Sequence, residues 1–295
     1  MVSSEREEFR CGESGVMQVQ WYPGHMTKAK RMMLDEIKLI DLVIELLDAR
    51  APLSSRNPDI DEMSKGKARL VLLNKSDLAD PDRNNAWLQY FREHGITALT
   101  VDSRNREGFG RIGKSIEEVC RDKKERDQKR GIMNRPVRAM VVGIPNVGKS
   151  TFINSMCRKS SARVGNKPGV TKGKQWIRLD KTTELLDTPG ILWPRFEDET
   201  TGINLAYIGS INDEIIDETE LATGLISYIA GSYAGALYDR YGVDESLDAV
   251  GILGGIANKR GCLKKGGECD YSKAANIVLD DFRSGKLGRI TLEEP

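Results

Sequence analysis

The stretch VRAMVVGIPNVGKST, from Val137 to Thr151, is the part of the sequence that most strongly indicates the fold. Val137–Val142 is apolar except for Arg138, which is typical of a strand buried in a sheet. The residues that follow fit the phosphate-loop pattern G-x-x-x-x-G-K-[ST], and a helix is predicted over 149–157. Glycines let backbone N–H groups converge on phosphate oxygens, and the helix N-terminus adds its positive dipole. We expect the phosphates of a nucleotide to bind at Asn146, Val147, Gly148, Lys149, Ser150 and Thr151.

Three residues of this loop have more specific predicted roles. Lys149 is expected to neutralise the β- and γ-phosphates, which makes it a catalytic residue, and Ser150 is expected to ligate Mg²⁺. Asn146 lies inside the loop, where two interpretations are open. Its side-chain oxygen helps to hold a K⁺ ion against the phosphates, or the side chain only braces the loop.

A second phosphate-related motif, Asp187-Thr188-Pro189-Gly190, follows a short apolar strand. Asp187 can hold Mg²⁺ through a water molecule, and the Gly190 N–H can meet the γ-phosphate. Residues 158–174, just upstream, are basic and include Thr171. The Thr171 hydroxyl can close on Mg²⁺ when the γ-phosphate is present, as in a switch loop, so it is both a catalytic and a metal candidate. The basic side chains fit either a solvated loop or contact with nucleic-acid phosphates.

The four residues Asn74-Lys75-Ser76-Asp77 follow another predicted strand and are typical of a guanine-binding loop. Asp77 can accept hydrogen bonds from N1–H and from the 2-amino group of guanine. Adenine offers neither at that edge and would leave the carboxylate unpaired and desolvated, which argues against an ATPase. Asn74 can reach the other edge of the base, and the Lys75 stem can lie over the ring. We therefore expect GTP and GDP as substrate and product.

Apolar runs and helical patterns alternate along the first two thirds of the chain, which indicates an α/β fold with a mostly parallel sheet and helices on both faces. Strands are predicted over 41–47, 69–73, 96–101 and 137–142, and a hairpin over 174–179 and 183–186. Helices are predicted over 27–39, 85–93, 113–129 and 149–157.

After Pro194 the pattern becomes helical throughout, and apolar residues recur at four-residue steps from Leu221 to Leu237. Helices are predicted over 220–238, 247–257 and 272–282. We expect three parts: a disordered extension over 1–16, a nucleotide-binding domain over 17–198, and a smaller all-helical C-terminal domain over 199–295.

Composition narrows the class of protein. The chain has 295 residues, 39% of them hydrophobic. Its 45 basic and 44 acidic residues leave a net charge of +1, which neither indicates nor excludes binding to nucleic acid. The five cysteines lack paired zinc-type spacing and fit free thiols in a reducing cytosol. No apolar run approaches the ~18 residues that span a bilayer, and the N-terminus does not resemble a signal peptide. We expect a soluble cytoplasmic protein.

The order of the motifs is unusual. The predicted guanine-binding loop Asn74–Asp77, called the guanine box below, precedes the phosphate loop at Gly143. This order resembles that of the circularly permuted GTPases, in which the strands are reconnected around the same site. The phrases WYPGHM (21–26), DARAP (48–52), SSRNP (54–58) and FRSGKLG (282–288) resemble the ribosome biogenesis GTPase A (YlqF) family. The resemblance extends from Met17 to roughly the C-terminus. It implies a circularly permuted P-loop GTPase domain followed by a small helical bundle.

The resemblance also implies a function. Such a GTPase assists late assembly of the large ribosomal subunit. Its expected partner is the subunit precursor, through rRNA and ribosomal proteins, and no binding to membranes or DNA is expected. The helical bundle is expected to bind RNA. Asp102 and Ser103 are expected to lie in the loop that backs the guanine base, and His25 is expected to serve hydrolysis.

One departure from the small-GTPase pattern bears on catalysis. Ile191 stands where a glutamine usually orients water, and it has no hydrogen-bonding group. His25 lies in a turn rigidified by Pro23 and Gly24, and a neutral imidazole there can align water on the γ-phosphate. The other interpretation is that His25 only packs this turn. The alternative function is then a GTP-gated binding switch with negligible intrinsic turnover.

Overall fold

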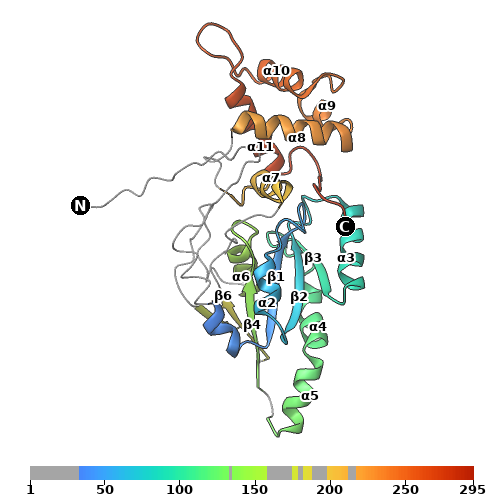
Figure 1. Cartoon of the computed structure of the whole chain (residues 1–295), viewed down its shortest axis with the longest axis vertical. Helices are drawn as coiled ribbons and strands as arrows, with labels where there is room; N and C mark the ends of the chain where they lie inside the picture. Colours follow the sequence, from blue (N-terminus) through green and yellow to red (C-terminus); the bar gives the residue numbers. More distant parts are fainter. Residues whose placement is uncertain (1–32, 133–134, 158–174, 179–181, 188–197, 212–216) are drawn as a thin grey trace, which may run out of the picture.

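The computed structural model describes residues 33–132, 135–157, 175–178, 182–187, 198–211 and 217–295. Within them, a six-stranded sheet has the order β3-β2-β1-β4-β6-β5 (Figure 1). All neighbouring strands are parallel except β5, which is antiparallel to β6. The predicted mostly parallel sheet and its edge hairpin are therefore confirmed. The strands are Leu42–Asp48 (β1), Ala68–Asn74 (β2), Thr97–Val101 (β3), Val137–Val142 (β4), Gln175–Arg178 (β5) and Thr183–Asp187 (β6).

Helices cover both faces of the sheet because the central strands are apolar at nearly every position. Successive side chains of a strand point to opposite faces, so such a strand must be buried on both. Ile44 packs in the core under α4 and α6, whereas Val43 packs with α2 and Leu47 packs with α3 on the other face. These helices are Pro58–Met63 (α2), Pro81–Glu93 (α3), Phe109–Val119 (α4) and Lys149–Cys157 (α6).

A layer of helices follows the last strand of the sheet along the chain. It lies beyond the edge of the sheet at which α6 begins (Figure 1). Its members are Glu199–Tyr207 (α7), Glu218–Ser232 (α8), Ala236–Tyr241 (α9), Ala249–Lys259 (α10) and Tyr271–Arg283 (α11). Buried side chains of this layer, such as Leu205 and Leu225, belong to the same apolar cluster as Ile44 of the sheet. The helical layer and one face of the sheet thus share a continuous core.

The single helix predicted over 220–238 is wrong, because α8 ends at Ser232 and α9 begins at Ala236. Tyr233 has φ −135° and ψ 57°, and Gly235 has φ 94°, so both residues leave the helical conformation. The Glu245 carboxylate accepts hydrogen bonds from the backbone N–H groups of Gly235, Leu237 and Tyr238. These bonds satisfy the free donors at the start of α9, and a carboxylate is favourable at a helix N-terminus.

The helix predicted over 113–129 is also two helices, α4 and α5 (Arg121–Lys129), and α4 begins earlier than expected, at Phe109. The boundary is Cys120, which is buried in the core with φ −98° and ψ 8°. α5 has no buried residue. The amphipathic pattern ends where the core ends, and the highly charged α5 projects away from the sheet (Figure 1).

The C-terminal segment after α11 returns to the sheet and ends beside α3 (Figure 1). Trp87 of α3 donates from Nε1 to the Glu293 carbonyl (3.4 Å). The Glu293 carboxylate accepts from the backbone N–H groups of Leu53 (2.6 Å) and Ser54 (2.9 Å). Burial raises the pKa of Glu293 in spite of these hydrogen bonds. The sequence gives no local signal for this return, because every contact is between residues far apart in the chain.

Candidate functional site

The candidate site lies at the edge of the sheet where the parallel strands end. β2 ends at Asn74, β3 at Val101 and β4 at Val142, and each is followed by one of the loops singled out in the sequence. Asn74 is in register with Asp48 of β1 on one side and with Val101 of β3 on the other. Ligands of open α/β sheets bind at this carboxyl edge.

Asn74 joins three loops. Its Nδ2 donates to the carbonyl of Val147 in the phosphate loop (2.7 Å), and its Oδ1 accepts from the N–H (3.1 Å) and hydroxyl (2.7 Å) of Ser103. Asn74 and Ser103 are almost fully buried. The structure therefore brings together the guanine box, the phosphate loop and the Asp102–Ser103 loop, as the sequence interpretation requires. It also gives Asn74 a structural role that the sequence did not indicate.

Gly148 is the residue that makes this junction possible. Its φ is +98°, a conformation that L side chains rarely adopt. A Cβ at this position would lie 2.4 Å from Asn74 Nδ2, which is nearer than any real contact. A glycine is thus required both by the turn of the loop and by the approach of the asparagine.

Lys149 is buried within the phosphate loop. Its exposed fraction is 7%, and Nζ donates to the carbonyls of Gly143 (3.0 Å) and Ile144 (2.8 Å). Ser150 and Thr151 occupy the first turn of α6, where backbone N–H groups lack intrahelical partners. The loop thus places an ammonium group and the positive end of a helix dipole side by side, an arrangement suited to phosphate.

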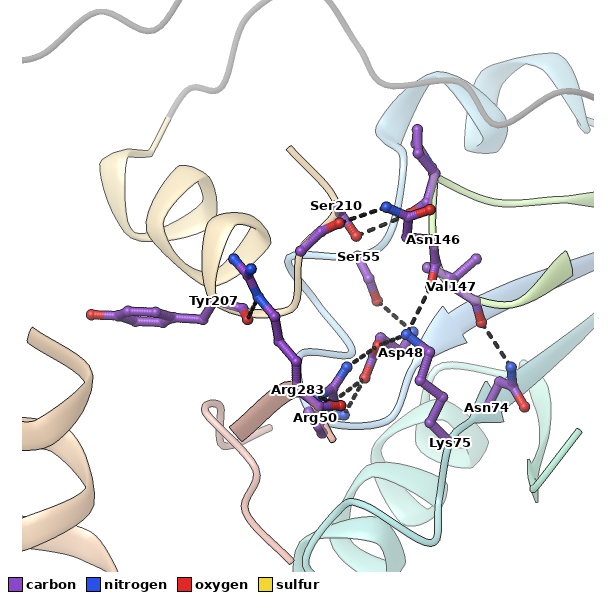
Figure 2. Close-up of polar contacts among 12 residues, drawn as sticks. Asp48, Arg50, Ser55, Asn74, Lys75, Asn146, Val147, Tyr207, Ser210 and Arg283 are labelled. Atoms are coloured by element: carbon purple, nitrogen blue, oxygen red, sulfur yellow. Dashed lines mark hydrogen bonds and ion pairs between the residues drawn. The ribbon is translucent and has the colours of Figure 1, made fainter. Parts of the chain in front are cut away.

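Lys75 of the guanine box takes part in a buried charge cluster (Figure 2). Its Nζ donates to Asp48 Oδ2 (2.8 Å) and to the Asn146 carbonyl (2.7 Å). Arg50 binds both oxygens of the same carboxylate, through Nε (2.9 Å) and Nη2 (2.8 Å). Burial lowers the pKa of Lys75, and Arg50 adds to this effect against the attraction of Asp48. The roles of Asp48 and Arg50 were not predicted, although both lie in the DARAP phrase.

Asp77 and Asp102 lie on neighbouring loops of the site. Asp77 is half-buried, and burial together with the charge of Asp102 raises its pKa. The Asp102 carboxylate is occupied by its own loop, because it accepts from the backbone N–H of Arg104 (2.7 Å) and of Asn105 (3.2 Å), and from Asn105 Nδ2 (2.6 Å). Of the two acids, Asp77 is therefore the better candidate for a ligand.

Comparison with known proteins decides the family. A model described as "50S ribosome-binding GTPase" matches residues 138–226. The chain is 47% identical to a ribosome biogenesis GTPase A of Priestia megaterium over 95% of its own length and 98% of that protein. The chain belongs to the ribosome biogenesis GTPase A family. It is therefore a GTPase, which hydrolyses GTP.

More distant relatives agree with this family. Mitochondrial ribosome-associated GTPase 1 of Xenopus tropicalis is 32% identical, with 98% of each chain covered. The crystal structure of GNP-bound YlqF from Thermotoga maritima has a TM-score of 0.63 and 29% identity, over 91% of this chain and 98% of that one. The matched GTPase model begins beside the phosphate loop and leaves Asn74–Asp77 upstream, as the permuted order of the family requires.

The helical layer of this GTPase reaches the phosphate loop directly (Figure 2). Asn146 Nδ2 donates to the Gly209 carbonyl (2.7 Å), and the Ser210 hydroxyl donates to the Pro145 carbonyl (3.0 Å). Gly209 and Ser210 follow the end of α7. The bracing role of Asn146, one of the two interpretations of this residue, thus has a structural basis, and its bond uses only the amide nitrogen.

A second route joins the charge cluster to the helical layer. Arg50 Nη1 donates to the Arg283 carbonyl at the end of α11 (3.3 Å). The Arg283 guanidinium donates in turn to the carbonyls of Ala206 (2.8 Å) and Tyr207 (3.1 Å) on α7. The helical layer is therefore connected to the site at two places. One is the phosphate loop, and the other is the charge cluster that includes Lys75 of the guanine box.

Several predicted residues lie outside the described part of the chain. His25, Thr171, Gly190 and Ile191 are among them, as is the predicted extension over 1–16. The backbone of Asp187 is described and pairs in register with Val141 of β4, which places it at the same edge of the sheet. Within the described residues, no helix could cross a membrane and no group of three acidic, His or Cys residues could hold a metal.

Proposed function

We propose that the loops at the carboxyl edge form the GTP site of this enzyme and that hydrolysis serves assembly of the large ribosomal subunit. The observation that best supports the site is the Asn74 junction, which holds a guanine-box residue against the phosphate loop at Val147 O (2.7 Å). The names of the relatives support the process, since they refer to ribosome biogenesis and to mitochondrial ribosomes. The proposed partner is the subunit precursor, through rRNA and ribosomal proteins, in the cytoplasm.

In this proposal the nucleotide lies across the Asn74 junction. The backbone of Asn146–Thr151 binds the phosphates, and the Lys149 ammonium neutralises the charge that develops on them during transfer. Asn74, Lys75, Ser76 and Asp77 hold the guanine base, with Asp102 and Ser103 behind it. The nucleotide-binding domain is assigned to 17–198, and the C-terminal domain, 199–295, which contains the helical layer, is assigned as the RNA-binding domain.

The residues present fit a Mg²⁺ ion. Ser150 is a partly exposed residue at the start of α6, and Asp187 ends the strand beside β4. Mg²⁺ in phosphoryl-transfer sites takes one or two protein oxygens and completes its shell with phosphates and water, so a three-acid cluster is not needed. When bound, the ion neutralises phosphate charge. Thr171, Gly190 and a K⁺ ion held by the Asn146 side-chain oxygen are the further proposed contacts.

Orientation of the attacking water is assigned to His25, since Ile191 cannot do it. A neutral imidazole accepts a hydrogen bond from water and helps to align it. We expect His25→Ala to bind GTP normally but to lose most of the turnover that ribosomal subunits stimulate. Stimulated turnover at the wild-type level in this variant would show that another group orients the water.

The test of the process is co-sedimentation with ribosomal subunits. We expect the protein to pellet with large subunits in the presence of a non-hydrolysable GTP analogue and to be released in GDP. Turnover is measured in parallel with and without large subunits. Equal sedimentation in both nucleotides, or with small subunits alone, would contradict the proposal. Nucleotide-dependent binding with no stimulated turnover would favour the alternative, a binding switch.

A further inference from the structure

The C-terminal segment holds the loop that carries Asp77. Arg289 donates from Nη2 to the Ser76 carbonyl (2.9 Å) and from Nε to the Ala79 carbonyl (2.8 Å). The N–H of the next residue, Ile290, donates to the Leu78 carbonyl (3.1 Å). Three carbonyls of one short loop are thus bound by two consecutive residues from the other end of the chain.

The segment that makes these contacts is itself firmly anchored. Ile290 is 1% exposed, and Thr291 is fully buried. The Thr291 hydroxyl accepts from the Asp80 N–H (3.0 Å), and its carbonyl accepts from the Tyr228 hydroxyl of α8 (2.7 Å). Arg289 is exposed, yet it extends from a backbone whose position is fixed by buried neighbours.

The guanine box supplies only part of its own support. The Ser76 N–H donates to the Val101 carbonyl (3.2 Å), and the Leu78 N–H donates to the Lys75 carbonyl (2.9 Å). Both of these bonds use backbone N–H groups of the loop. The carbonyls of Ser76 and Leu78 accept their bonds of 2.9 Å and 3.1 Å from the C-terminal segment. The peptide group just before the Asp77 Cα, whose oxygen is the Ser76 carbonyl, is thus held by Arg289, with a longer bond from Asn84 Nδ2 (3.4 Å). The peptide group after Leu78 is held by Ile290.

We propose that Arg289 is a positioning residue for guanine recognition, which fixes the Ser76–Ala79 loop so that Asp77 meets the base. This inference rests on the proposed role of Asp77. A carboxylate that accepts two parallel hydrogen bonds must be held in one orientation, and a loop that is fixed beforehand loses less entropy on binding. Guanine selectivity is thus set partly by a residue that follows the last helix and does not touch the nucleotide.

A positioning role predicts a distinctive pattern of effects. The base is common to GTP and GDP, so Arg289→Ala should weaken both equally and should raise the KM for GTP without changing kcat. Inosine nucleotides lack the 2-amino group and engage Asp77 through one hydrogen bond only. The variant should therefore lose more affinity for GDP than for IDP, and the ratio of the two affinities should shrink.

The experiment is calorimetric titration of the full-length protein with GDP and IDP in Mg²⁺. We expect Arg289→Ala to weaken GDP binding about fivefold, the scale of one or two modest hydrogen bonds, and to weaken IDP binding less. The matched control is Arg83→Ala, which removes bonds to Glu293 O (3.4 Å) and to Glu294 (2.7 Å) further along the same segment. This control should leave the GDP to IDP ratio at the wild-type value.

Two outcomes would overturn the inference: an unchanged GDP to IDP ratio in Arg289→Ala, or the same reduced ratio in Arg83→Ala. If Arg289→Ala does not fold, Arg289→Lys replaces it, since lysine can reach only one of the two carbonyls. Arg289→Lys should reduce the ratio of GDP affinity to IDP affinity by about half of the reduction expected for Arg289→Ala. A wild-type ratio would count against the proposal.

Asp77→Asn separates this inference from the proposed function. If it leaves GDP affinity unchanged, the assignment of the guanine box is wrong. If it weakens GDP strongly, and Arg289→Ala in that background changes the ratio no further, both hold. If Asp77→Asn weakens GDP and Arg289→Ala has no effect on the ratio in the wild-type background, only the role of Arg289 is lost.

Discussion

Replacing Asp48 with asparagine would remove the negative charge at the centre of the cluster under the guanine box. The carboxylate is fully buried and accepts from Arg50 Nε (2.9 Å), Arg50 Nη2 (2.8 Å) and Lys75 Nζ (2.8 Å). The amide has nearly the same shape, but it leaves the Arg50 guanidinium, 1% exposed, without a counter-charge. Removal of one partner of a buried ion pair costs about 3–5 kcal/mol, and we expect Asp48→Asn to lower the free energy of unfolding by that amount.

The pH of the measurement follows from the pKa of Asp48. Burial opposes ionisation, but Arg50 and Lys75 outweigh it and hold the pKa well below its usual range. The ionised carboxylate therefore stabilises the fold at any pH above about 3.9, the usual aspartate value, and this contribution is lost as the pH falls toward the lowered pKa. At neutral pH the whole contribution is present, so the two proteins should differ most there and should converge in strong acid.

Urea unfolding at neutral pH, followed by tryptophan fluorescence, measures the difference. Asp61→Asn is the matched control. Like Asp48, Asp61 pairs with two basic side chains, here Arg56 and Arg69, but its own side chain is 46% exposed. Exposed pairs contribute at most about 1 kcal/mol, so this control should cost little. A loss below about 1 kcal/mol in Asp48→Asn, or equal losses in both variants, would refute the reasoning.

Three further predictions concern the phosphate loop. Gly148→Ala should lower stability by about 2 kcal/mol or more and weaken GDP binding, because φ is +98° and the new Cβ would meet Asn74 Nδ2; a normal unfolding midpoint would contradict this. Lys149→Ala or Ser150→Ala should reduce single-turnover hydrolysis by at least about 100-fold, and wild-type turnover in either would remove the loop from the site. Turnover should be faster in KCl than in NaCl, and equal rates would refute a K⁺ ion at Asn146.

The parts of the fold that follow local rules could be predicted from the sequence. The bounds of β4 and α6 agree with the prediction, because an apolar strand, a glycine loop and a helix start are written in adjacent residues. The β5–β6 hairpin was likewise predictable from two short runs around a turn. The guanine box and the phosphate loop are likewise each predictable from neighbouring residues, since each directly follows an apolar strand.

The features that the sequence did not reveal depend on residues far apart in the chain. The break between α8 and α9 is stabilised by Glu245, which the four-residue spacing of Leu225 and Ile229 cannot indicate. Asp48 and Arg50 of the charge cluster are visible in the sequence only as part of the DARAP motif, which does not indicate their contact with Lys75. The return of the C-terminal segment joins Arg289 to Ser76, and no periodicity or motif encodes such a contact. Burial and pairing of this kind are decided by the assembled core.

Through these long-range contacts the helical layer is connected to both ends of the proposed nucleotide site. It touches the phosphate loop through Gly209 and Ser210, and it leads into the segment that binds the guanine box through Arg289. A partner that displaces the layer must strain or break one set of bonds. Binding free energies are reciprocal, so such a partner must change nucleotide affinity by the same factor by which the nucleotide changes affinity for the partner. The residues that join the helices to the two loops are therefore the candidates for coupling between the proposed partner and GTP.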